Sequence, residues 1–126
     1  MNKIKAELVE IKNKDDVNLL IFKCKGNFIK VITLEINFDI DEANLFFKPT
    51  MVSISKEKCK TSIENNLKAK ILSIEKGEIF SNIYCKYNDE EIEVIILNES
   101  VNKLNLNIND EVYLMIKASD IGVSVD

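Results

Sequence analysis

The chain has 126 residues, of which 46% are apolar and 30% charged, and its net charge is −4. These values suit one typical domain or two very small ones and exclude a disordered chain. The absence of histidine removes the commonest general acid–base group and excludes Ser-His and Cys-His catalysis. Because no glycine-rich phosphate-binding motif is present either, we predict that the chain is not an enzyme.

The distribution of charge and apolar residues argues against two further classes. The net charge is +2 over residues 1–61 and −6 over residues 62–126, without a polybasic patch, so we expect no nucleic-acid binding. No apolar run approaches the roughly 18–20 residues that span a bilayer. The N-terminal segment also lacks the apolar region of a secretory signal. We therefore expect a cytoplasmic protein that does not associate with a membrane.

The three cysteines, Cys24, Cys59 and Cys85, do not form a metal-binding pattern. Their number is odd, they have no C-x-x-C spacing, and no histidine can assist them. We expect no metal site and no organic cofactor. Each cysteine is interpreted as a small buried apolar residue or an inert surface thiol, and the alternating stretch around Cys85 favours the core.

The period-two alternation of apolar and polar residues predicts five strands in each half of the chain. These runs are dense in β-branched and aromatic residues, which favour strands. In chain order the predicted strands are 4–11, 18–25, 28–34, 43–48 and 51–55, then 67–74, 81–88, 91–97, 110–117 and 120–125. We expect the last two strands of each set to close their own unit, with Pro49 between those of the first.

A short helix is predicted over Asn98–Leu106, with Asn98 as the N-cap and Glu99 in the first turn. Its shorter counterpart within residues 37–45 stays open. Five strands with a helix between the third and fourth is the order of an OB-like barrel. The predicted fold class is all-β, with two tandem OB-like five-stranded small barrels, each with at most one short helix between strands 3 and 4.

The two halves are copies of one unit. At an offset of 63 residues, Asn2–Ile11 aligns with Asn65–Ile74, and nine identities fall within residues 2–34. Later the offset becomes 69, which aligns FFKPTMVSIS (Phe46–Ser55) with MIKASDIGVS (Met115–Ser124). The Lys-x-Ser/Thr motif therefore occurs twice because the unit that contains it is repeated.

The repeat divides the chain into a first unit at 1–56, a polar linker at 57–64 and a second unit at 65–126. The first unit is the shorter and more divergent. About 60 residues is marginal for an independent hydrophobic core. We therefore expect the units to pack on each other or on other chains, and a homo-oligomer is a reasonable expectation.

Four stretches of the second unit follow the pattern of a known family: SIENNLKAKI at the opening, EKGEI at the turn, NESVNKLNL at the helix, and NDEVYLMIKASDI near the end. Through these stretches the second unit, from Ser62 to Val125, resembles a Mop or TOBE domain, the small molybdate-binding fold. The first unit matches more weakly, through KIKAELVEI and FFKPTMVSI. Together the two units resemble a tandem Mop protein.

The resemblance implies a function and an assembly. Such proteins bind the tetrahedral oxyanions molybdate and tungstate at interfaces between units, and tandem forms are typically trimers. It implies a cytoplasmic binding protein for storage, buffering or homeostasis. The residues that it implies for the oxyanion are Lys117, Ala118, Ser119, Ser62, Asn65, Ser100, Lys48 and Thr50. A dianion needs converging donors and compensating charge, which lysines, hydroxyls and the N–H of Ala118 or Ser119 could supply, with Asn65 orienting the opening segment.

Some positions depart from the family pattern. Glu64 stands where the opening motif has arginine, and Leu97 stands where sensor domains have threonine. A carboxylate repels an anion, so either Glu64 points away or its site is weakened. Nothing in the first unit stands opposite Ser62. Some sites of the standard set could therefore be lost, while one full set could combine the opening of the second unit with a Lys-x-Thr from another.

Two alternatives stay open beside the oxyanion-binding protein. In one, the Mop fold persists as a structural or interaction module that has lost anion binding. In the other, the chain is an OB-type nucleic-acid binder, which the acidic second unit and the lack of alternating aromatic residues disfavour. The pattern does not distinguish molybdate from tungstate.

Overall fold

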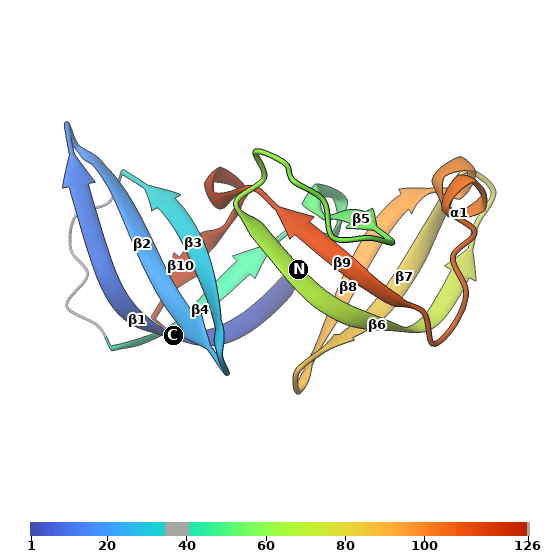
Figure 1. Cartoon of the computed structure of the whole chain (residues 1–126), viewed down its shortest axis with the longest axis horizontal. Coiled ribbons are helices and arrows are strands. Elements are labelled where there is room, and N and C mark those ends of the chain that lie inside the picture. The colour runs from blue at the N-terminus through green and yellow to red at the C-terminus, as the bar shows by residue number, and fades with distance from the viewer. Residues whose placement is uncertain (35–40, 126) are drawn as a thin grey trace.

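The computed structural model describes residues 1–34 and 41–125, which form two five-stranded sheets side by side (Figure 1). The first half contains β1 (Asn2–Lys14), β2 (Val17–Cys24), β3 (Asn27–Thr33), β4 (Glu42–Phe47), the 3₁₀ turn η1 (Pro49–Met51) and β5 (Ser53–Ser55). The second half contains β6 (Asn65–Lys76), β7 (Phe80–Tyr87), β8 (Glu90–Leu97), α1 (Asn98–Leu104), β9 (Glu111–Ile116), the 3₁₀ turn η2 (Ala118–Asp120) and β10 (Gly122–Ser124). The ten predicted strands are confirmed. Of the residues 37–45 left open for a first helix, 37–40 lie outside the described ranges, and the segment from Glu42 onward belongs to β4 and is not helical.

The pairing of strands confirms the internal repeat. In the first sheet Asn2 pairs with Phe47, and in the second sheet Asn65 pairs with Ile116. Asn65 lies 63 positions after Asn2, and Ile116 lies 69 positions after Phe47, as the alignment of the two repeats predicts. Both long strands also change register at equivalent places, between Leu8 and Glu10 in β1 and between Ile71 and Ser73 in β6. The two units therefore share their irregularities as well as their regular pairing.

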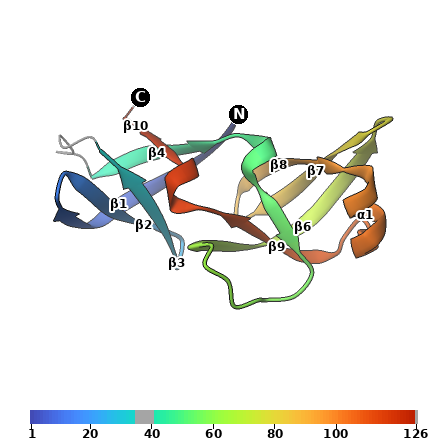
Figure 2. The same cartoon turned by 90° about the horizontal axis from the view of Figure 1, so that it is seen from above.

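The closing strands are exchanged between the units, which corrects one expectation. We expected each unit to end its own sheet, but the strand orders are β10-β4-β1-β2-β3 and β5-β9-β6-β7-β8. Gly122 of β10 pairs with Phe46 of β4, and Ser53 of β5 pairs with Met115 of β9. Each half of the chain thus completes the sheet of the other (Figures 1 and 2).

The hydrophobic core follows from the alternation of the strands. In β2 and β7 the same alternate positions are buried, and every second residue faces the core. The buried apolar residues of both units form one cluster, which includes the fully buried Phe22, Phe47 and Tyr87. One core that spans both units answers the marginal size of each unit.

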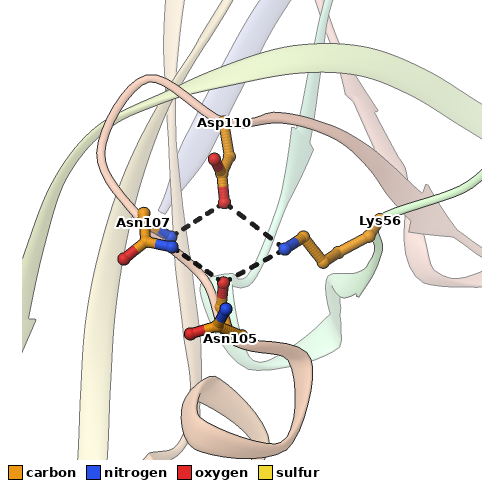
Figure 3. A network of polar contacts seen from close by, with 4 residues as sticks. All are labelled: Lys56, Asn105, Asn107 and Asp110. Atoms are coloured by element: carbon orange, nitrogen blue, oxygen red, sulfur yellow. Dashed lines mark hydrogen bonds and ion pairs between the residues drawn. The ribbon is translucent and has the colours of Figure 1, made fainter.

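The segment after β5 is tied to the second unit by a small polar network (Figure 3). The Lys56 ammonium donates to the carbonyl oxygen of Asn105 at 3.1 Å and lies 3.7 Å from an Asp110 carboxylate oxygen. That carboxylate also accepts the backbone N–H of Asn107 at 2.9 Å. The network holds the exit of the exchanged strand against the loop between α1 and β9.

The predicted helix is present, but Asn98 is not its N-cap. The helix begins at Asn98, and Leu97 is the cap residue. The Asn98 side chain instead donates to the carbonyl oxygen of Gly77 at 2.7 Å and accepts from the hydroxyl of Ser81. Asn98 therefore fastens the start of α1 to the β6–β7 turn.

Candidate functional site

The two Lys-x-Ser/Thr motifs adopt the same local structure. Lys48 precedes η1 with φ −77° and ψ 142°, and Lys117 precedes η2 with φ −68° and ψ 141°. In each motif the carbonyl oxygen of the lysine accepts a hydrogen bond from the backbone N–H three residues later, which is that of Met51 at 3.0 Å and that of Asp120 at 2.9 Å. The repeated sequence thus makes a repeated turn that presents a lysine and a hydroxyl residue.

Each turn lies against the opposite unit. The turn η1 of the first half contacts β8, and η2 of the second half contacts β3. Both turns lie near the middle of the molecule, where the two sheets meet (Figure 2). This crossing follows from the strand exchange, because the chain passes through each turn as it leaves one sheet for the other. Candidate site residues from different repeats therefore come together.

Thr50 and Ser100 meet in a hollow of about 430 Å³, here called the Thr50–Ser100 hollow. Thr50 comes from η1 and Ser100 from α1, and Ser53 supplies a third hydroxyl. The remaining lining is apolar and includes Phe80 and Leu97, which are 53% and 43% exposed. None of the described residues that line this hollow is basic. The hollow offers hydroxyl donors to a ligand but no compensating charge of its own.

Lys48 and Ser119 line a second hollow of about 180 Å³, here called the Lys48–Ser119 hollow. It combines a cation from the first repeat with a hydroxyl from the second. Asp120 and the aromatic pair Phe46 and Phe47 also line it. The carboxylate of Asp120 opposes an anion here, so the hollow is less electropositive than Lys48 alone suggests.

Asn65 is buried, with 1% of its surface exposed, and it contacts the other unit. Its Oδ1 accepts the backbone N–H of Lys30 at 2.7 Å, and its Nδ2 donates to the carbonyl oxygen of Lys30 at 2.8 Å. Asn2, the equivalent residue, makes the same two bonds to the backbone of Glu93, each at 2.8 Å. Both amide atoms of Asn65 are thus engaged with protein, and its side chain joins the units.

Glu64 does not point away from the second Lys-x-Ser motif. Its Oε1 accepts the backbone N–H of Ala118 at 2.7 Å, and Ala118 is fully buried. This N–H is one of the donors expected from the sequence to face an oxyanion. The departure at Glu64 therefore places a carboxylate on a predicted anion donor.

Lys117 and Ser62 lie at exposed positions and are not brought together with the other candidates by a described hollow. Lys117 precedes η2, and Ser62 lies in the segment between β5 and β6. The structure therefore groups the predicted residues as two pairs, Thr50 with Ser100 and Lys48 with Ser119.

Sequence reasoning missed Asn2, Ser53 and Asp120 as part of these surroundings. Asn2 could have been found, because it aligns with Asn65 in the repeat and both precede an alternating strand. Ser53 and Asp120 carry no such signal, since their place depends on the strand exchange. Within the described ranges, no group of three His, Cys, Asp or Glu side chains could hold a metal ion, and no helix is long and apolar enough to cross a membrane.

Comparison with known proteins gives a family and a similar fold. The model of the TOBE domain matches residues 61–123, which is half of the chain. A similar solved structure is that of the cytoplasmic molybdate-binding protein ModG, in a form with molybdate bound. Its TM-score is 0.92 at 19% identity, over 99% of this chain and 96% of that chain, so the two share a fold. No curated protein gives a significant sequence match.

Proposed function

The chain belongs to the TOBE-domain family, and on this premise we propose that it binds tetrahedral oxyanions, molybdate or tungstate. The TOBE domain is a binding module and not a catalytic one, in agreement with the prediction that the chain is not an enzyme. The proposal includes a cytoplasmic role in oxyanion storage, buffering or homeostasis, performed by two OB-like barrels in tandem. The shared fold with ModG, a protein described as binding molybdate, supports it.

The observation that carries the proposal is the meeting of Thr50 and Ser100 in one hollow. These hydroxyls come from different repeats, and the resemblance to the Mop domain implies an oxyanion role for both. A tetrahedral dianion is held by several donors that converge from different directions. Two hydroxyl-bearing elements that face one hollow supply part of such a set.

The missing charge supports assembly as part of the proposal. The described residues around the Thr50–Ser100 hollow include no lysine, and a desolvated dianion without a compensating charge is strongly disfavoured. Exposed apolar side chains, among them Phe80, Leu97 and Ile79, border this region and suit contact with another chain. We propose a homotrimer in which a neighbouring copy completes the site.

The alternative function is a structural or interaction module without an anion site. Two observations favour it. Glu64 occupies the N–H of Ala118, and Leu97 presents an apolar side chain at the hollow where sensor domains of the family have threonine. In this alternative the same oligomer forms, but no oxyanion changes its stability.

Isothermal titration of the full chain tests the proposal, with molybdate and tungstate as ligands and sulfate and phosphate as controls. We expect saturable binding of molybdate or tungstate that T50A or S100A weakens tenfold or more. S73A is the matched control, because Ser73 lies on β6 outside both hollows. Sedimentation should give three times the chain mass of 14.4 kDa. A folded oligomer that binds none of the anions would establish the alternative.

A further inference from the structure

The contact between Glu64 and Ala118 has the features of an occupied anion site. Ala118 is fully buried, and its N–H points at a carboxylate oxygen 2.7 Å away. A buried N–H needs an acceptor, and a bond to an ionised acceptor is stronger than one to a neutral group. The carboxylate therefore provides the negative oxygen that an external oxyanion would otherwise bring.

The same contact cannot form in the first repeat. Pro49 stands at the position equivalent to Ala118, and proline has no backbone N–H. Met1 stands at the position equivalent to Glu64. The acceptor is thus absent in the repeat that lacks the donor and present in the repeat that has it. The two Lys-x-Ser/Thr motifs, which fold alike, therefore differ in whether an internal carboxylate accepts a backbone N–H of the motif.

The negative charge of Glu64 is not neutralised by a basic partner in the described part of the chain. Its side chain is exposed, and among the described residues no basic group forms an ion pair with it, although Lys117 is next to Ala118 in sequence. An oxyanion that approached the N–H of Ala118 would meet a like charge at close range, which opposes binding. The occupation of the Ala118 N–H by Glu64 and this repulsion both disappear when the carboxylate is removed.

We propose that Glu64 is a built-in anion that blocks the binding of external oxyanions at the second Lys-x-Ser motif. The first motif, with Lys48 and Thr50, is then the one that remains available to oxyanions in the unaltered chain. Glu64 makes the two repeats unequal in binding, and its side chain sets how many oxyanions each chain takes. The inference rests on the proposed oxyanion function and concerns the regulation of that site.

The test compares the full-length chain with E64Q, E64A and the control E57A. The glutamine side chain of the E64Q variant keeps an oxygen that can accept the N–H of Ala118 but removes the charge, so E64Q guards against misfolding of E64A. Glu57 is an exposed acid in the same segment, so E57A removes equal charge elsewhere. Titration calorimetry with molybdate gives affinity and stoichiometry, and the Ala118 amide resonance in NMR spectra reports local binding.

We expect E64A and E64Q to gain a binding event or to bind molybdate at least tenfold more tightly, while E57A resembles the unaltered chain. The Ala118 amide should shift with molybdate in E64A but not in the unaltered chain, and adding K117A should reverse the gain. Unchanged affinity and stoichiometry in both Glu64 variants would overturn the inference and leave the proposed function intact. If neither the unaltered chain nor any variant bound molybdate, the proposed function itself would fail, and this inference with it.

Discussion

Asn65 and Lys30 are joined across the two units by a pair of hydrogen bonds, from the amide of Asn65 to both backbone polar groups of Lys30. Lys30 lies in β3, the edge strand of the first sheet, and Glu93, the partner of Asn2, lies in β8, the edge strand of the second. An amide side chain presents both an N–H donor and a carbonyl acceptor, as a neighbouring strand would. The two asparagines therefore satisfy edge backbone groups that would otherwise be open to foreign strands.

We predict that N65A lowers the free energy of unfolding by about 1–3 kcal/mol, because it leaves two partly buried backbone groups without a partner. N2A should cost a similar amount, since Asn2 makes the same pair of bonds. Urea denaturation measures both variants. N13A is the control, because the side-chain hydrogen bond of the exposed Asn13, to Asn18, lies within the β1–β2 hairpin and does not join the units. This variant should change stability by less than about 0.5 kcal/mol. A stability loss in N13A as large as in N65A would contradict the role of these asparagine bonds between the units.

A side chain at Gly122 should be unfavourable, because the ring of Phe46 lies against this position and would have to move. A Cβ at this position would lie 2.4 Å from the ring. We predict that G122A destabilises the chain by about 1–3 kcal/mol through overpacking where β10 joins the first sheet. The equivalent residue of the other exchanged strand is Ser53, which pairs with Met115.

The matched control for G122A is S53A, which should change unfolding in urea very little. The double variant F46L/G122A tests the cause directly, because removing the ring should recover part of the lost stability and give a favourable coupling energy. A G122A chain as stable as the unaltered one, or additive effects in the double variant, would show that the ring does not exclude the side chain.

The strands and the repeat could be predicted because both depend on local patterns. Alternation fixes which residues of β2 and β7 face the core, and the offsets of 63 and 69 reappear in the strand pairing. The exchange of β5 and β10 could not be predicted, because Ser53–Ser55 and Gly122–Ser124 occupy equivalent registers on β9 and β4. Short strands with equivalent partners carry no local information about which partner each one chooses.

The sequence names candidate residues for the site, but it does not show how they are grouped in space. The repeated motif identifies Lys48 and Thr50 together, yet they line different hollows, with Lys48 just before the turn η1 and Thr50 within it. Glu64 was recognisable as a departure from the family, but its bond to Ala118 joins residues 54 positions apart. Asn65 was expected to orient the opening segment, and its contact with Lys30 depends on how the units pack.

The three cysteines should differ sharply in reactivity. Cys24 and Cys85 are buried, while Cys59 is exposed. We predict that an aromatic disulfide reagent modifies one thiol quickly in the folded chain and all three after denaturation. C59S should remove the fast phase and leave the other two thiols slow. A fast phase that survives in C59S would mean that the core opens readily around Cys24 or Cys85.

Cys85 should also make the folded chain sensitive to alkali. Burial raises the pKa of its thiol from 9.0 to about 12, because the thiolate would lose its hydration in the core. Above pH 9 the unfolded chain releases this proton before the folded chain does, so the unfolded state binds fewer protons. The stabilisation is complete below pH 9 and is lost as the pH rises toward 12, by at most about 4 kcal/mol from this group.

Urea denaturation between pH 7 and 11, under reducing conditions, measures this loss. Burial also raises the pKa of Cys24 and Tyr87, so their contributions have the same sign and the unaltered chain should lose stability steadily above pH 9. C85A should start less stable at neutral pH, because it leaves a small cavity, but its stability should fall less steeply with pH. C59A removes an exposed thiol and should keep the steep slope. Parallel slopes for C85A and the unaltered chain would show that Cys85 ionises without unfolding the core. The alkaline loss would then come from the other groups whose pKa is raised in the folded chain, among them Cys24 and Tyr87.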